Sequence, residues 1–246
     1  MIIEAAGVSD IGRVRPTNQD RFRIFLEEAI FLVADGMSTP KGGEIAAELA
    51  AEWLRPSLKN YLQNIEKITD KNVFDALLTT IASINHKVLN YSKEENTDTE
   101  GMGTTLTTAF AYNNSVFLAH VGDSRAYLYR AEKLLLLTED HSLIDLMIKR
   151  GEITEEEATT HPSRRALSRY IGMADLITPD LHKIEFSVGD RLLLCSDGLI
   201  KELSDRVISE IVSKQASALE TCEELVSRAN QQGGQDNITV VVIDHH

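Results

Sequence analysis

The chain has 246 residues, of which 43% are hydrophobic and 26% are charged, the balance of a globular protein that can bury a sizeable core. This composition excludes disordered, collagen-like and disulfide-scaffold proteins. The 25 Lys and Arg residues and 38 Asp and Glu residues give a formal net charge of −13, which disfavours nucleic-acid binding and suits a protein that holds cations.

In chain order, three predicted strands (2–8, 22–26, 30–34) precede two long predicted helices (44–63, 72–91). Four strands follow (104–112, 116–121, 126–129, 134–137), then a short helix (142–149), a strand (192–195), a helix (219–230) and a last strand (238–243). The pairs Asn113-Asn114 and Gly189-Asp190 are predicted hairpin turns. Because the helices interrupt the strands rather than alternate with them, we expect an α+β fold with mainly antiparallel sheets.

No Pro- or Ser-rich linker divides the chain, so we expect a single domain over residues 1–246. The longest apolar run, residues 29–34, is too short to span a membrane, and no secretory signal is expected at the N-terminus. We therefore expect a cytoplasmic protein that does not bind membranes. Cys195 and Cys222 have no CxxC spacing and are interpreted as buried thiols.

Four aspartates border predicted strands and precede a small or turn-forming residue: Asp35 before Gly36, Asp123 before Ser124, Asp197 before Gly198 and Asp236 before Asn237. The preference of Asp for turns explains any one of them, and it is the interpretation we keep for Asp190. Together they predict a carboxylate cluster whose repulsion is relieved by protons or cations. With no His or Cys at a ligand spacing, the favoured ions are Mg²⁺ or Mn²⁺.

Seven motifs follow one another along the chain: Arg15-Pro16-Thr17-Asn18-Gln19-Asp20, Val33-Ala34-Asp35-Gly36-Met37, Gly101-Met102-Gly103-Thr104-Thr105, Val121-Gly122-Asp123-Ser124-Arg125-Ala126-Tyr127, Asp140-His141-Ser142, Cys195-Ser196-Asp197-Gly198-Leu199 and Gly234-Gln235-Asp236-Asn237-Ile238-Thr239. In this order they resemble the metal-dependent serine/threonine protein phosphatases (PPM, type 2C) in their compact bacterial form. The resemblance extends from about Ser9 to Val242. The resemblance is specific because all seven motifs occur in this order, whereas each motif alone is common.

This resemblance implies a sandwich of two mainly antiparallel β-sheets flanked by helices, a four-layer αββα arrangement, with a dinuclear metal site at one end. By position, Asp35 is expected to bridge two Mn²⁺ or Mg²⁺ ions and the carbonyl of Gly36 to ligate one of them. Asp197 and Asp236 are expected to ligate the other ion, and all three aspartates are thereby expected to be catalytic.

Four further positions carry over from the resemblance. Arg15 matches the arginine that binds the substrate phosphate, and its planar, permanently charged guanidinium suits that task. Asp20 matches an acid that acts mostly through metal-bound water, and Asn237 matches a residue that flanks the metal ligands. Asp123 matches a position linked to a third, weakly held metal.

The implied activity is hydrolysis of phosphoserine and phosphothreonine in proteins by a water activated between two divalent cations, a hydrolase of signalling pathways. Its partners are expected to be phosphorylated proteins, with a cognate serine/threonine kinase among them and no nucleic acid, and the protein is expected to be a monomer. The alternative is a catalytically silent phosphatase-like domain that binds phosphoproteins or regulatory partners; loss of a metal-binding Asp would indicate it, and all four are present.

Three positions depart from the family pattern. Met37 replaces the histidine proposed as a general acid in eukaryotic members, and Ser38-Thr39 replaces the Gly-Gly of bacterial relatives. Lys201 stands where many relatives carry an acid four residues after the position of Asp197, which argues against a third metal.

The segment 141–172 is expected to include a flap beside the active site. Its arginines, Arg164, Arg165 and Arg169, form a basic group that either contacts phosphopeptides or is a solvated surface. We interpret its His161 as structural.

Overall fold

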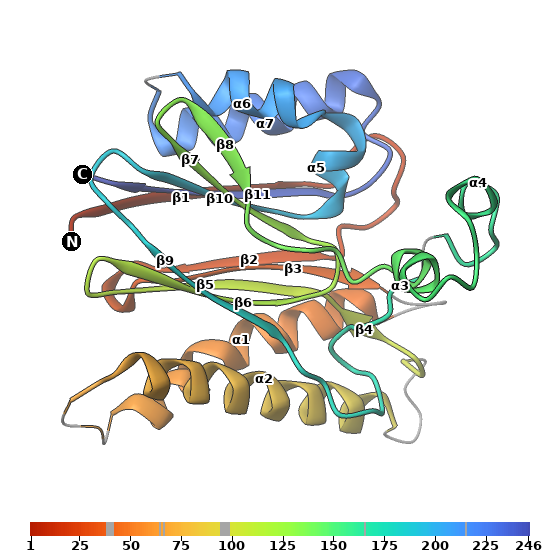
Figure 1. The fold of residues 1–246 in the computed structure, drawn as a ribbon, viewed down its shortest axis with the longest axis horizontal. Helices are drawn as coiled ribbons and strands as arrows, with labels where there is room; N and C mark the ends of the chain where they lie inside the picture. The colour runs from red at the N-terminus through yellow and green to blue at the C-terminus, as the bar shows by residue number, and fades with distance from the viewer. Residues whose placement is uncertain (38–41, 64, 66, 94–98, 165, 215) are drawn as a thin grey trace.

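Two antiparallel β-sheets lie face to face between two helical layers (Figure 1), which confirms the predicted αββα sandwich. The computed structural model describes residues 1–246 except 38–41, 64, 66, 94–98, 165 and 215. The first sheet contains, in spatial order, β1 (Ile3–Asp10), β11 (Ile238–His245), β10 (Arg191–Cys195), β7 (Arg125–Arg130) and β8 (Lys133–Leu136). The second contains β2 (Asp20–Phe25), β3 (Ile30–Met37), β5 (Leu106–Tyr112), β6 (Ser115–Val121) and β9 (Asp180–Glu185), and the short β4 (Gly103–Thr104) pairs with the end of β3.

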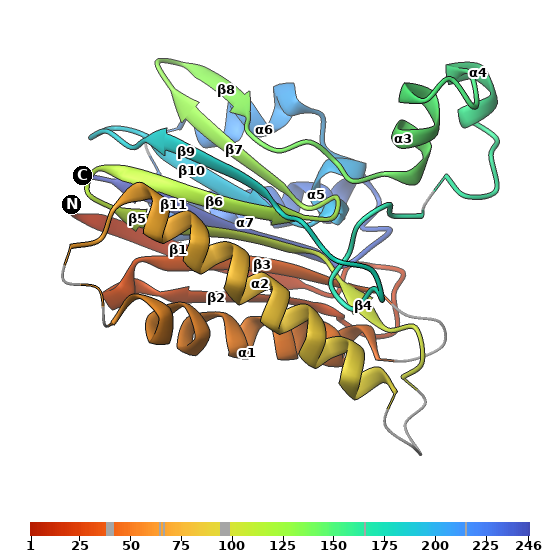
Figure 2. The same cartoon turned by 60° about the horizontal axis from the view of Figure 1, so that its bottom comes forward.

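Helices cover the outer face of each sheet. The second sheet is covered by α1 (Gly43–Leu62) and α2 (Asp70–Ser92), and the first by α5 (Asp197–Glu202), α6 (Asp205–Val212) and α7 (Ala218–Gln232). A 3₁₀ turn (Leu26–Glu28) joins β2 to β3, whereas α3 (Leu143–Lys149) and α4 (Glu155–Ala158) project beyond one end of the sandwich (Figures 1 and 2). None of the described helices combines the length and apolar character needed to cross a bilayer.

The alternation of side chains along β3 explains why its first five residues, 30–34, are continuously apolar. Phe31 and Val33 belong to the core between the two sheets, whereas Leu32 and Ala34 belong to the core beneath α1 and α2. Successive side chains of a strand point to opposite faces, so a strand buried on both faces needs apolar residues at every position.

The structure contains all the predicted strands and helices, with shifted boundaries. The run 104–112 is two strands, because β4 pairs with the end of β3 and β5 with its first half. The prediction omitted β9, an edge strand with partly exposed polar residues, and the short helices α4, α5 and α6. Cys195 and Cys222 are buried free thiols, as predicted.

The two predicted hairpin turns have different outcomes. Asn113 and Asn114, with φ values of 48° and 55°, form a two-residue turn between the paired strands β5 and β6, as predicted. The Gly189-Asp190 prediction is wrong as a hairpin, because the turn joins β9 in one sheet to β10 in the other. Asp190 is buried there and accepts hydrogen bonds from Arg130 and from the backbone N–H of Ser187.

Candidate active site

Antiparallel pairing brings the predicted aspartates to one end of the sandwich. Because β2 begins where its partner β3 ends, Asp20 pairs directly with Asp35. In the first sheet β10 and β11 pair in the same way, so Asp197, just after β10, lies near Asp236, just before β11. The turn between β6 and β7, which passes from one sheet to the other, carries Asp123 to the same end.

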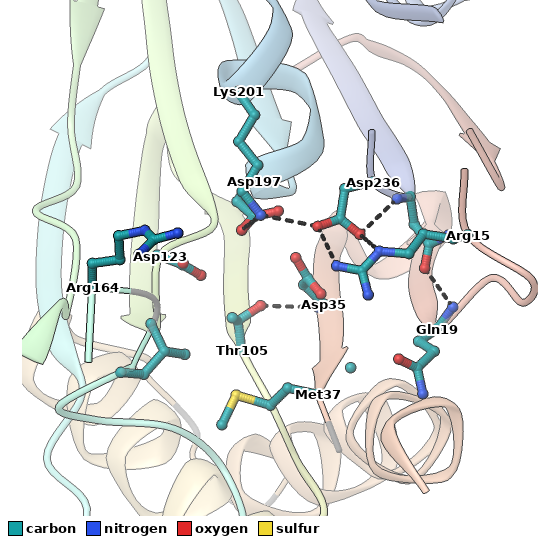
Figure 3. Close-up of a pocket in the computed structure, with 13 residues that line it drawn as sticks. Arg15, Gln19, Asp35, Met37, Thr105, Asp123, Arg164, Asp197, Lys201 and Asp236 are labelled. Carbon is teal, nitrogen blue, oxygen red and sulfur yellow. Dashed lines mark hydrogen bonds and ion pairs between the residues drawn. The ribbon is translucent and has the colours of Figure 1, made fainter. Parts of the chain in front are cut away.

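Four of these aspartates, Asp35, Asp123, Asp197 and Asp236, surround a cavity of about 280 Å³ (Figure 3). The structure brings residues distant in sequence together here, and it adds six to the residues that were predicted to form the site: Gln19, Met37, Thr105, Arg164, Leu167 and Lys201. The complete lining is Arg15, Gln19, Asp35, Gly36, Met37, Thr105, Asp123, Arg164, Leu167, Asp197, Lys201, Asp236 and Asn237. Asp20 is absent from the lining and is buried behind it.

A close approach of two backbone segments sets the spacing of Asp197 and Asp236. A Cβ atom at Gly198 would lie only 1.9 Å from the carbonyl oxygen of Asn237. Only glycine therefore allows the first turn of α5 to pack against the residues that precede β11.

Thr104 and Thr105, at the junction of β4 and β5, hold the backbone of Asp35 in place. The backbone N–H of Asp35 donates to Thr105 Oγ1 at 2.9 Å (Figure 3). The carbonyl of Asp35 accepts from Thr104 Oγ1 at 3.0 Å. Burial, followed by the charges of Asp20 and Asp197, raises the pKa of the Asp35 carboxyl well above its usual range. Thr105 was inside a quoted motif, and only its position beside Asp35 gives it a role.

Two more carboxyls are held in low-dielectric surroundings. Asp20 is 2% exposed; its Oδ2 accepts a hydrogen bond of 2.7 Å from Ser196 Oγ, and burial raises its pKa to about 6. Burial, followed by the charge of Asp197, raises the pKa of Asp123 to about 7. Such pKa values indicate that burial makes the negative charge of these carboxyls costly, and a bound cation would stabilise that charge.

Two cationic side chains hold the carboxylate of Asp236. Arg15 binds it bidentately, with Nε 2.8 Å from Oδ1 and a terminal nitrogen 2.8 Å from Oδ2. Lys201 Nζ lies 2.9 Å from Oδ2 and also contacts Oδ2 of Asp197. Burial raises the pKa of Asp236, but the hydrogen bonds from Arg15 and Lys201 outweigh it and hold that pKa below its usual value.

Asn237 acts on the loop that carries Arg15. Its Nδ2 donates to the carbonyls of Ile11 and Thr17, each at 2.9 Å, and its Oδ1 accepts from the backbone N–H of Gln19 at 2.9 Å. The side chain is thus fully engaged with the backbone of the 11–19 loop, which fixes the position of Arg15 relative to Asp236.

The Asp140-His141-Ser142 motif fastens the turn that carries Asp123. His141 Nδ1 accepts the backbone N–H of Gly122 at 3.0 Å, so Nε2 carries the proton that it donates to Asp180 Oδ2 at 3.2 Å. Burial lowers the pKa of His141, which keeps the ring in this neutral, bridging form. The motif therefore joins the active-site turn to the start of β9.

The segment 141–172 contributes Arg164 to the cavity, whereas Arg169 lies 2.7 Å from Asp180 and supports the base of the segment. The structure thus separates the predicted basic group; Arg165, like Ser38-Thr39, lies outside the described residues. His161 Nδ1 accepts the backbone N–H of Ser163 at 3.1 Å, an arrangement that closes a local turn.

The donor atoms around the cavity fit hard divalent ions. Carboxylate oxygens dominate, and Oδ1 of Asp20 and Oδ1 of Asp197 are buried without a hydrogen-bond partner among the described residues. Within the same described part of the chain, no three His, Cys, Asp or Glu side chains already form the ligand shell of an ion. In Figure 3 the carboxylate of Asp236 is paired with Arg15 and Lys201.

Comparison with known proteins gives consistent results. A family model described as Protein phosphatase 2C matches residues 9–239. Serine/threonine phosphatase stp of Listeria monocytogenes (serotype 4b) is 36% identical over 239 residues, 96% of this chain and 93% of the relative. Protein phosphatase PhpP of Streptococcus pneumoniae is 34% identical over 255 residues, 98% of this chain and 97% of the relative.

Solved structures agree with these sequence matches. The serine/threonine phosphatase of S. agalactiae superposes with a TM-score of 0.87 and 32% identity over all of both chains. The catalytic domain of the serine/threonine protein phosphatase PstP in complex with two manganese ions superposes with a TM-score of 0.77 and 33% identity, over 98% of this chain and 97% of that chain. The chain therefore belongs to the protein phosphatase 2C family.

Proposed function

We propose that this phosphatase hydrolyses phosphoserine and phosphothreonine in proteins by means of a water activated between two Mn²⁺ or Mg²⁺ ions. The observation that carries the proposal is the convergence of Asp35, Asp123, Asp197 and Asp236 on one cavity that also contains Arg15. The relatives named as serine/threonine phosphatases, and the PstP structure with two manganese ions, support the same activity.

Asp35, the carbonyl of Gly36, Asp197 and Asp236 are the groups we assign to the two ions. When bound, the ions would neutralise the phosphate and lower the pKa of an attacking water. Asp35 on β3 lies opposite Asp20 on β2, and this strand pairing would hold the Asp35 carboxylate in a fixed position as a metal ligand. Lys201 argues against a third ion near Asp123, because it adds a positive charge there.

Arg15 is assigned to the substrate phosphate. Its side chain is 47% exposed, so the guanidinium reaches the open side of the cavity while its loop is fixed by Asn237. The planar fork that now binds the two oxygens of Asp236 matches two oxygens of a phosphoryl group equally well.

The leaving serine or threonine oxygen must gain a proton. Met37 occupies the cavity position from which a histidine could supply one, and its thioether cannot. We assign this proton to water in the cavity. The expected partners remain phosphorylated proteins, a serine/threonine kinase among them, and a monomer suffices because every assigned group comes from one chain.

The decisive experiment is phosphate release from a phosphothreonine peptide and from p-nitrophenyl phosphate, with and without Mn²⁺. We expect turnover that requires Mn²⁺ or Mg²⁺ and disappears with EDTA. Turnover in metal-free buffer would contradict the two-ion chemistry, whereas a folded protein inactive with every divalent ion would indicate the silent, binding-only domain.

A further inference from the structure

Lys201 is a cation built into the carboxylate cluster. It lies in α5, four residues after Asp197, and this spacing places both side chains on one face of the helix. Its Nζ contacts Oδ2 of Asp197 and lies 2.9 Å from Oδ2 of Asp236 (Figure 3). One ammonium group thus joins two carboxylates that come from separate parts of the chain.

The low exposure of the two carboxylates strengthens their attraction to the ammonium group of Lys201. The side chains of Asp197 and Asp236 are only 15% and 16% exposed, so water screens their charges weakly. Lys201 is 45% exposed, and the described hydrogen bonds give its Nζ no other partner. The group therefore neutralises the cluster and can also swing out into solvent without any change in the backbone.

We propose that Lys201 is a resident counter-ion that competes with a divalent ion for Asp197 and Asp236, and thereby sets how tightly that ion binds. The proposal rests on the proposed function, in which these two aspartates ligate one ion. Their Oδ2 atoms cannot accept from the ammonium and coordinate an ion on the same lone pairs. An ion that takes these lone pairs displaces the ammonium from them, and the charge of Lys201 repels the ion while it remains beside the two carboxylates.

Two opposite effects follow when the ammonium is removed. The divalent ion loses a competitor, so it binds more tightly. The protein without the ion loses its internal counter-ion, so the carboxylates repel each other and the fold becomes less stable. If Lys201 served only to stabilise α5, its removal would lower the stability of the protein without any gain in metal affinity.

The test is calorimetric titration of the EDTA-treated, dialysed protein with Mn²⁺, with free Mn²⁺ followed in parallel by electron paramagnetic resonance. The variants are Lys201→Gln, Lys201→Arg, which keeps the charge, and Lys71→Gln. Lys71 is the matched control because it pairs with Asp75 at helical spacing on the exposed surface of α2. Melting temperatures in EDTA are measured on the same samples.

We expect Lys201→Gln to bind one Mn²⁺ at least about tenfold more tightly, because a unit charge a few ångströms from an ion in a partly buried site is worth more than that factor. Lys201→Arg should stay within about threefold of the parent protein in this affinity. In EDTA Lys201→Gln should melt a few degrees lower, roughly 2–4 °C. Lys71→Gln should change neither quantity.

Equal Mn²⁺ affinity of Lys201→Gln and the parent protein, with both folded, would overturn the proposal, and so would equal tightening in Lys201→Arg. Asp197→Asn separates this failure from failure of the proposed function. If Asp197→Asn binds as many ions as the parent, Asp197 is no ligand, and the proposed site and the competition fail together. If it loses an ion while Lys201→Gln has no effect, the competition alone is wrong.

Discussion

Asp20 and Asp35 are directly opposite each other in the antiparallel pair formed by β2 and β3. Opposite residues of such a pair project to the same face of the sheet, about 5 Å apart at Cβ. Burial raises the pKa of both carboxyls, and the charge of Asp20 adds to the rise at Asp35. The pairing register of two strands therefore places two buried carboxyls side by side behind and at the cavity.

Replacing Asp35 by Asn should have opposite effects on activity and stability. The neutral amide is a poorer ligand for a divalent ion, so Mn²⁺-dependent turnover should fall by more than about a hundredfold. The amide also ends the repulsion with Asp20 and Asp197, so the melting temperature in EDTA at neutral pH should rise by roughly 3–6 °C. Asp175→Asn, at an exposed position, is the control and should change neither quantity. Full turnover in Asp35→Asn would remove Asp35 from the ligand set.

Asp123→Asn should stabilise the protein in EDTA, and the gain should depend on pH. The pKa of Asp123 rises from 3.8 to about 7 on folding. When folding raises the pKa of an acid, the free energy of unfolding is lowered by the full amount at any pH above the folded pKa. This loss of stability shrinks as the pH falls toward the unfolded pKa, because the folded state takes up the proton first. The variant should melt roughly 3–6 °C above the parent at about pH 8 and near it at about pH 4.

The comparison of variant and parent at each pH is essential to this experiment. Burial lowers the pKa of His120 to about 3, so folding loses stability below the usual histidine pKa as the pH falls. That loss opposes the gain from Asp123 in the raw melting curves, and it cancels in the difference. A difference that is constant from pH 8 to pH 4 would mean that the carboxyl of Asp123 is not perturbed.

Arg15→Lys should weaken substrate binding more than it slows the chemical step. A lysine keeps the charge but loses the planar pair of donors, so KM for a phosphothreonine peptide should rise about tenfold. Arg13→Ala, in the same exposed loop but outside the cavity lining, serves as the control. An unchanged KM in Arg15→Lys would indicate that the guanidinium serves only as a partner for Asp236.

Asn237→Ala should loosen the loop that carries Arg15. Three hydrogen bonds to backbone groups of Ile11, Thr17 and Gln19 disappear, at a cost of about 1–3 kcal/mol for the buried groups left unpaired. Trypsin should then cleave after Arg13, in the same loop, faster than in the parent, as peptide mass spectrometry would record. Asn90→Ala, at an exposed position on α2, is the control. Unchanged cleavage would show that other contacts fix the loop.

The sequence predicted those elements whose burial leaves a local pattern. Residues of β3 and β5 are apolar at nearly every position because both faces are covered, and α1 and α2 show helical spacing because one face packs on a sheet. The edge strand β9 has no such pattern, since its polar side chains are partly exposed and its pairing with β6 alone defines it. The six-residue helix α5 is too short for periodicity to detect.

The residues of the site likewise fall into those that the sequence predicted and those that it could not predict. Four aspartates, Asp35, Asp123, Asp197 and Asp236, could be named because each stands beside a small or turn-forming residue next to a predicted strand. Arg15 could be named only because the order of motifs resembles a known family. Local order could not predict that Lys201 bridges Asp197 and Asp236, that Asn237 binds the 11–19 loop, or that Arg164 faces the cavity while Arg169 does not. These facts depend on which strands pair and in which register.

The amino-acid order alone predicted the α+β class and the chemistry of the donor atoms, since burial and turn formation are read residue by residue. The order of its motifs carried the resemblance that implied the layered sandwich and the family. The tertiary structure alone decided which charges face one another. Electrostatic energy depends on distance through space and on access to water, and both quantities are set only when segments far apart in the chain are brought together.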